Sequence, residues 1–264
     1  MDSAFLAAAR LWDELGAYQS GDAEASRFHV MAGLCDLLGA HNAGWVGAVR
    51  TVVQDDDPLH GWRIGALSYL HPAEANQETI REMETRWRRR EADPFNIIGV
   101  SRAGTFRVFT LRREMPESWF EADYYRDFYA RRGIFDARCV STPVTSDAES
   151  FFIFHRDQAA GAFGVAEIDL AAYTLRGRRR RHRSWMLARG LLIASQPLSP
   201  AERRVLGHLL SGDQEKQIAA KLELSATTTH DHVKSIYRKF GVGSRAALMS
   251  LWLDRPAASS RPDH

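Results

Sequence analysis

Residues 226–240 carry the pattern that most constrains how this chain of 264 residues can fold. Positions spaced at i, i+4, i+7 and i+11 give one apolar stripe along a helix, formed by Thr229, Val233, Ile236 and Phe240. The opposite face holds polar and charged side chains alone, namely Thr227, His230, Asp231, Lys234 and Arg238. Such a helix must bury its stripe against neighbouring elements and leave its polar face in solvent.

A helix with a strong start signal precedes this segment. Ser199 and Glu202 stand at the spacing of a capping box, in which each side chain accepts from the backbone N–H of the other residue. Pro200 fills the first helical position, where no N–H donor is needed. Gly212 is placed to end the helix in a left-handed conformation. The inner face of this first helix would be formed by Val205, Leu206, Leu209 and Leu210.

Two further short helices complete the predicted unit. One covers residues 215–222 and is followed by a turn at Glu223, where a left-handed backbone would cost strain. Ser225 then caps the helix at 226–240, and Ser244 caps a fourth helix that runs to about residue 252. Two short helices and a turn that set a polar-faced helix outward give the geometry that enters the major groove of DNA.

Together these motifs resemble the LuxR-type helix-turn-helix over residues 198–253. That family binds DNA as a dimer, so the resemblance implies a sequence-specific, dimeric transcription regulator. The chain departs from the family pattern at Glu223, where Gly or another permissive residue is usual, and at Thr229, where Val is common. His230 and Asp231 stand where Lys and an apolar residue are frequent, so the target sequence does not carry over. The motifs that carry the resemblance are Leu198–Leu206, Glu215–Ala219, Leu224–Ser225, Thr228, His232–Val233 and Lys239–Arg245.

We expect this unit to contact DNA with two sets of side chains. Base edges would be read by His230, Asp231 and Lys234, and Asp231 could accept from a cytosine amino group. The net charge of the chain is only +2, so nucleic acid must bind to a local patch rather than through bulk charge. The residues expected to contact the phosphate backbone are Lys216, Ser225, Thr227, Thr228, Arg238, Lys239 and Arg245.

The segment Ser195–Pro200 contains two prolines in four residues, and we place a domain boundary there. A sensor-like domain is expected over residues 1–195, the helix-turn-helix over 198–254, and a disordered tail over 255–264. The first domain is predicted to be α+β, with an antiparallel sheet flanked by helices, and its element order resembles GAF and PAS sensor domains. Its expected helices are 1–16, 28–38, 80–87, 116–131 and 167–194, and its expected strands are 43–53, 61–70, 105–111, 137–145, 150–156 and 161–165.

Aromatic side chains are frequent in the first domain, and such residues line small-molecule pockets as well as ordinary cores. We single out Trp45, Trp62, Tyr69 and Trp87 as candidates for a ligand pocket, without a ligand that they would identify. An acyl-homoserine-lactone receptor is one alternative, although the aromatic and acidic residues of such a domain do not align cleanly here. The acidic run at residues 55–57 falls in a turn between two strands, so we interpret it as a solvated loop and not as a phosphoacceptor site.

Arginine dominates residues 176–183, where only Gly177 and His182 interrupt the run. On one continuous helix these side chains would point in all directions. A solvated linker helix is the simpler interpretation of this pattern. The alternatives are a second contact to the DNA backbone and a signalling helix that spans a dimer.

Other functional classes find little support in the sequence. It contains no Gly-rich phosphate loop, metal-ligand spacing or Ser-His-Asp context, so we expect neither an enzyme nor a metal or other cofactor. Cys35 and Cys139 fit small core residues in a reducing compartment. Neither a signal peptide nor a membrane-length apolar run is present, which predicts a cytoplasmic protein.

The expected partners are double-stranded DNA, a second copy of the chain, a small-molecule effector and RNA polymerase, with no membrane among them. DNA binding depends on the polar face of the helix at 226–240, and Asp231 would repel phosphate there. An alternative function is therefore a protein-interaction regulator whose helix-turn-helix no longer binds DNA.

Overall fold

A computed structural model describes residues 3–51, 56–72, 78, 81–82, 85–86, 91–192 and 198–251. The chain forms two compact units. The first contains the residues up to Gly16 and Ser26–Arg179, and the second contains Ala17–Ala25 and the chain from Arg180 onward. Within the ranges given above, no helix is both long enough and apolar enough to cross a membrane.

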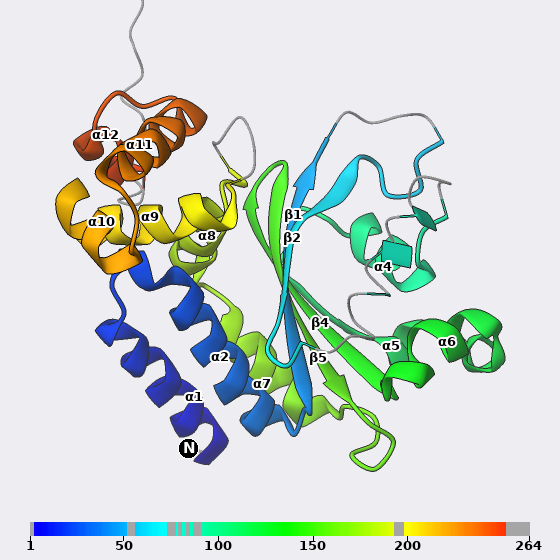
Figure 1. The fold of residues 1–264 in the computed structure, drawn as a ribbon. Coiled ribbons are helices and arrows are strands. Elements are labelled where there is room, and N and C mark those ends of the chain that lie inside the picture. Colours follow the sequence, from blue (N-terminus) through cyan, green and yellow to red (C-terminus); the bar gives the residue numbers. More distant parts are fainter. Residues whose placement is uncertain are drawn as a thin grey trace, which may run out of the picture. The chain divides into compact units, whose positions relative to one another are not determined.

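An antiparallel sheet is the centre of the first unit (Figure 1). Its five strands lie in the order β2-β1-β5-β4-β3. Phe152 on the central strand β5 pairs with Trp45 on one side and with Val140 on the other. This architecture confirms the predicted α+β fold. The strands are β1 Asn42–Arg50, β2 Trp62–Tyr69, β3 Arg107–Thr110, β4 Asp136–Thr145 and β5 Ala148–Arg156.

Helices cover both faces of this sheet, as Figure 1 shows. One face carries α1 (Ser3–Glu14), α2 (Ala23–Leu38), which belongs to this unit from Ser26 onward, and α7 (Val165–Leu175). The other face carries α4 (Pro94–Ser101), α5 (Leu111–Glu114) and α6 (Asp123–Phe128). Alternate residues of β4 point to opposite faces, and Cys139 packs into the aromatic core on the α4–α6 side. Short 3₁₀ helices lie at η1 Leu15–Ala17, η3 Glu117–Glu121 and η4 Ala130–Arg132.

Three elements that the sequence predicted within residues 1–195 are wrong in detail. The helix expected over 116–131 is interrupted at Ala122, whose extended backbone (φ −72°, ψ 152°) separates η3 from α6. No strand forms at 161–165, because Gly161 is left-handed (φ +70°) and α7 already begins at Val165. The helix expected over 167–194 ends at Leu175 and resumes as α8 (Arg179–Ala188), with Gly177 at φ +77° between them.

Other expectations lie partly or wholly outside the described residues. The helix predicted over 80–87 is described at only a few positions, and the tail at 255–264 at none. Helix α4 was not predicted from the sequence, although Asp93 and Pro94 form its start. The Asp93 carboxylate accepts from the N–H of Phe95 at 2.8 Å, and Pro94 occupies the first turn.

The second unit contains the four predicted helices of the helix-turn-helix together with α8 from Arg180 onward. All four begin within two residues of the predicted starts. Its apolar core is formed by Leu187, Leu198, Val205, Leu206, Leu209, Leu210, Ile218, Val233, Ile236, Phe240 and Leu248. The helices are α9 Pro200–Leu210, α10 Glu215–Leu222, α11 Ala226–Phe240 and α12 Arg245–Ser250.

A segment from near the N-terminus also packs in the second unit. The 3₁₀ helix η2 (Ser20–Asp22) lies against α9, where Gly21 meets Gly207 backbone to backbone. A Cβ atom built on Gly21 would stand 2.2 Å from the carbonyl oxygen of Gly207. The sequence analysis, which placed all residues before 195 in the first domain, did not predict this contact. Gly21 and Gly207 are almost two hundred positions apart, so no local pattern connects them.

We predict that Gly21→Ala loosens the packing of residues 17–25 on α9, since the new methyl group overlaps the Gly207 carbonyl. The expected cost is about 1–3 kcal/mol, as for other overpacked sites. Hydrogen exchange should show faster exchange of the amides in residues 17–25. Gly16→Ala is the matched control, because a Cβ there meets nothing within 4 Å. Unchanged exchange in Gly21→Ala would contradict the close approach.

Candidate nucleic-acid interface

Helix α11 is anchored at both ends by the residues that the sequence indicated. The Ser225 Oγ accepts from the N–H of Thr228 at 3.0 Å, and Gly241 ends the helix with φ +64°. Thr229 is fully buried, and its Oγ1 donates to the Ser225 carbonyl oxygen at 3.0 Å. A threonine therefore fits the apolar stripe, because the helix itself satisfies its hydroxyl group.

The turn ahead of α11 is also as predicted. Glu223 adopts a left-handed conformation with φ +54° and ψ 41°, and its N–H donates to the Ala219 carbonyl. A residue with a Cβ pays strain in this region, where Gly would not. The turn nonetheless holds, because Leu224 packs against the core just after it.

Eight of the ten predicted DNA-contacting residues are exposed on this unit. The three assigned to bases share the polar face of α11, opposite the buried stripe that ends at Phe240. Exposed donors also stand at the start of α10 and around the N-terminus of α11, where free backbone N–H groups favour anions. The exposed residues are Lys216, Ser225, Thr227, Thr228, His230, Asp231, Lys234 and Arg238.

Lys239 and Arg245, the other two predicted phosphate contacts, are engaged inside the domain. The Lys239 Nζ lies 2.7 Å from the Glu202 Oε2, and its side chain is only 15% exposed. The Arg245 guanidinium donates to the carbonyl oxygens of Asp213 and Leu209. These cations close the ends of other helices and are not presented to a ligand, which the sequence could not show because their partners lie far away in the chain.

Glu202 is the acceptor on which several of these contacts converge. Its Oε2 accepts from the Ser199 N–H at 2.6 Å, which completes the predicted capping box, and its Oε1 accepts from the Ser235 Oγ at 2.8 Å. Burial disfavours the charged form of this carboxyl. The hydrogen bonds from Lys239, Ser199 and Ser235 outweigh burial and lower the pKa of Glu202 to about 2.

A hydrogen-bonded pair of side chains lies at the protein surface, between α10 and α11. The His230 Nδ1 is 3.0 Å from the Glu215 Oε2, and the two side chains are 52% and 43% exposed. His230 is therefore held by a carboxylate from the first turn of the preceding helix. The sequence predicted the position of His230 on the polar face but not this partner.

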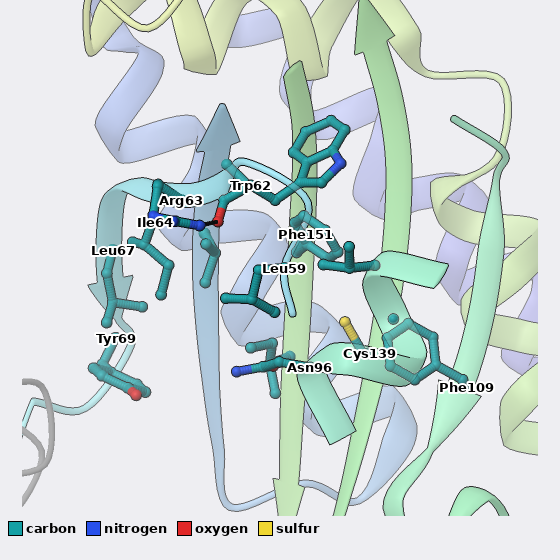
Figure 2. A pocket seen from close by; sticks show the side chains of 15 residues that line it. Leu59, Trp62, Arg63, Ile64, Leu67, Tyr69, Asn96, Phe109, Cys139 and Phe151 are labelled. Carbon is teal, nitrogen blue, oxygen red and sulfur yellow. Dashed lines mark hydrogen bonds between the residues drawn. The ribbon is translucent and has the colours of Figure 1, made fainter. Parts of the chain in front are cut away.

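The first unit contains a cavity of about 120 Å³ between the sheet and α4 (Figure 2). Its wall is mostly apolar, and the lining residues that carry polar side-chain nitrogen or oxygen atoms are Trp62, Arg63, Tyr69 and Asn96. A dry cavity of about 150 Å³ can hold benzene, so this space suits a small apolar group. The lining residues are Val46, Ala48, Leu59, Trp62, Arg63, Ile64, Leu67, Tyr69, Asn96, Gly99, Val100, Phe109, Cys139, Phe151 and Ile153.

The four predicted pocket residues separate in the structure. Trp62 and Tyr69 line the cavity (Figure 2). Trp45 does not: its indole N–H donates to the Ser150 Oγ at 2.8 Å, and the Arg27 guanidinium lies 4.5 Å from the centre of its ring. Trp87 falls outside the described residues. Residues from α4 that line the cavity, such as Asn96, were missed because the sequence did not reveal that helix.

Asp57 was predicted to lie in a solvated loop at residues 55–57, and for this residue the prediction is wrong. Its side chain is buried, and it accepts from the N–H groups of Leu59 at 3.0 Å and Gly61 at 2.7 Å. Arg63 donates to the same carboxylate at 2.9 Å. Burial opposes the charged form, but these hydrogen bonds lower the pKa of Asp57 below its usual range. Asp57 thus shapes the turn that places Leu59 and Trp62 in the cavity wall.

The arginine run at 176–183 is not one continuous helix, because Gly177 separates α7 from α8. Three of its arginines belong to the first unit, where they are exposed and contact separate neighbours. The Arg178 guanidinium lies over Trp12 at 4.8 Å, and Arg176 lies over Phe106 at 5.5 Å. Arg179 donates to the Val144 carbonyl at 2.7 Å. The break at Gly177 therefore lets neighbouring arginines reach separate partners.

The second unit has the geometry of a helix-turn-helix: α9 is capped, α10 is short, and a tight turn sets α11 with its polar face outward. Domains of this class read DNA with the helix that follows the turn, which here is α11. Within that class, residues 196–252 match the family model described as bacterial regulatory proteins, luxR family. The C-terminal domain of this chain is thus a luxR-family helix-turn-helix.

Solved structures of regulators are similar to this chain at low sequence identity. SdiA in complex with octanoyl-rac-glycerol is 14% identical, with a TM-score of 0.48 and 95% of each chain covered. Escherichia coli SdiA in the space group P6522 is 16% identical, with a TM-score of 0.45, and the match covers 92% of this chain and 94% of that chain. CepR2 from Burkholderia cenocepacia, described as N-acylhomoserine lactone dependent, is 17% identical, with a TM-score of 0.45. The match covers 71% of this chain and 95% of that chain.

We predict that the stability of the second unit depends on ionised Glu202. Its folded-state pKa lies below the unfolded value, so the stabilisation is present above about pH 4.5 and is lost as the pH falls toward about 2. The loss should reach at most about 3 kcal/mol. Glu202→Gln should remove this part of the acid dependence, as measured by thermal melts between pH 2 and pH 7.

Glu223→Gln is the control, since Glu223 is exposed and should leave the acid profile unchanged. Side-chain ¹³C titration of Glu202 reports the same group directly. A carboxyl that titrates near the ordinary glutamate value would contradict the role of Lys239 and Ser199 as its partners.

Proposed function

We propose that this protein is a sequence-specific DNA-binding transcription regulator that inserts α11 into the major groove. The observation that carries the proposal is the division of α11 into a buried stripe and an exposed polar face. His230, Asp231 and Lys234 lie on that face within little more than one turn, which suits contact with neighbouring base pairs. A luxR-family domain at residues 196–252 supports the same conclusion.

The phosphate contacts in this proposal differ from those expected from the sequence alone. Lys216 and Arg238 are exposed and can neutralise phosphates on either side of the groove. Ser225, Thr227 and Thr228 surround the start of α11, where hydroxyl and backbone N–H groups can donate to one phosphate. Lys239 and Arg245 are left out, because each already has internal partners.

We further propose that the first unit is a sensor that binds a small, largely apolar molecule in the cavity beside α4. Trp62, Tyr69 and Asn96 give that cavity a few polar groups on an apolar wall, as in many ligand pockets. The regulator would act in the cytoplasm as a homodimer on double-stranded DNA, with RNA polymerase as a further candidate partner. This role requires neither catalysis nor a cofactor.

Lys234→Ala should weaken binding to a selected operator by roughly 1–3 kcal/mol and relax the preference at one base position. Arg238→Ala should instead weaken all duplexes alike and reduce the slope of log K against log salt by about one. Lys239→Ala should leave that slope unchanged and lower thermal stability, because Lys239 pairs with Glu202. Fluorescence anisotropy over a salt series measures DNA binding by all three variants, and thermal melts measure the stability of Lys239→Ala.

Wild-type protein that binds no duplex above the non-specific level would contradict the proposal. It would favour instead a regulator that acts through protein contacts alone. A changed salt slope in Lys239→Ala with unchanged stability would show that this lysine contacts phosphate after all.

The cavity is tested with indole as a probe, since its ring is small and carries one N–H donor. Indole should bind wild-type protein weakly. Ala48 lines the cavity, so the larger side chain in Ala48→Phe should fill it and abolish binding. Ile97→Phe is the control, because Ile97 is exposed on α4 and does not line the cavity. Ligand-observed NMR is the measurement, and equal binding to both variants would place the indole elsewhere.

A further inference from the structure

We infer that Glu215 fixes which atom of His230 faces the DNA, and that the recognition helix therefore selects bases with an amino group in the major groove. The inference rests on the proposed function and names the chemistry of its target. Glu215 acts as a positioning residue, because it contacts His230 and not the base. His230 and Asp231 are then the residues that read the amino groups.

The geometry at the start of α10 determines the tautomer of His230. The Glu215 Oε2 lies 3.0 Å from the His230 Nδ1. An ionised carboxylate only accepts hydrogen bonds, so Nδ1 must carry the proton that is shared between them. In a neutral imidazole the other nitrogen, Nε2, then has a free lone pair and acts as an acceptor. The side chain is 52% exposed, so this acceptor is open to a ligand.

Glu215 can hold this position at little cost. It lies in the first turn of α10, where the helix dipole favours a negative side chain. The exposed Lys216 beside it offers a compensating charge near the DNA backbone. A carboxylate near the DNA backbone is otherwise unfavourable, because it repels the phosphates. The hydrogen bond to His230 is the contact through which Glu215 would act.

Asp231 adds a second acceptor next to His230. The two are adjacent in sequence and both exposed, so α11 presents two acceptors to neighbouring base pairs. In the major groove the amino groups belong to cytosine N4 and adenine N6, whereas guanine and thymine present acceptors. Lys234 lies one turn after His230 and can donate to guanine O6 or N7. The expected target therefore has C or A at the positions that His230 and Asp231 contact, and G at the position that Lys234 contacts.

Selection from a random duplex library at pH 8 tests this inference with full-length protein. Wild-type protein should enrich C or A over G or T roughly tenfold at the position that His230→Ala makes indifferent. Glu215→Lys places a donor beside Nδ1 and moves the proton to Nε2. The preference at that position should then invert to G or T.

Glu223→Lys is the matched control, since it makes the same charge change on an exposed glutamate outside this pair. It should raise general affinity and leave the base preference unchanged. ¹⁵N NMR of His230 in the free protein gives a second measurement that does not depend on DNA. It should show a proton on Nδ1 in the wild type and a proton on Nε2 in Glu215→Lys.

The outcomes separate the two proposals. A wild-type protein that enriches no sequence overturns the proposed function and this inference with it. A wild-type protein that enriches a site whose preference is the same in Glu215→Lys overturns the inference alone. Nε2 protonation in the wild type at pH 8 also overturns it, whatever sequence is selected.

Discussion

The buried carboxylate of Glu202 is the contact on which the geometry of the DNA-binding unit depends. It closes the N-terminus of α9 through Ser199 and holds the last turn of α11 through Lys239. The first and third helices are thereby fixed against each other at one point, in addition to their apolar packing. Because that packing buries the stripe at Val233 and Ile236, the polar face of α11 can only point outward.

This arrangement has a consequence for the chemistry of the interface. Lys239 and Arg245 stabilise the domain through internal contacts, and the polar face of α11 carries the acidic residue Asp231. Fewer cations remain for the phosphates, so hydroxyl groups and the helix N-terminus at Ser225 must contribute more of the binding. Specificity in such an interface depends more on hydrogen-bond complementarity than on charge.

The sequence predicted the parts of this unit that follow from local rules. The capping box at Ser199, the left-handed turn at Glu223 and the cap at Ser225 each involve residues within four positions of one another. Contacts that join distant residues were not predictable in the same way. The pair of Lys239 with Glu202 and the approach of Gly21 to Gly207 depend on packing that no local pattern encodes.

The cavity shows why strand patterns predict ligand residues only in part. Along β1, Val46 and Ala48 line the cavity, so strict alternation turns Trp45 to the opposite face. Along β2 the alternation fails, because Gly47 pairs with Ala66 while Ala48 pairs with Ile64, which leaves one extra residue between them. The extra residue is Gly65, so Ile64 before it and Leu67 after it line the same cavity although they lie three positions apart. A bulge of this kind redirects side chains towards a site, and periodicity alone cannot reveal where it falls.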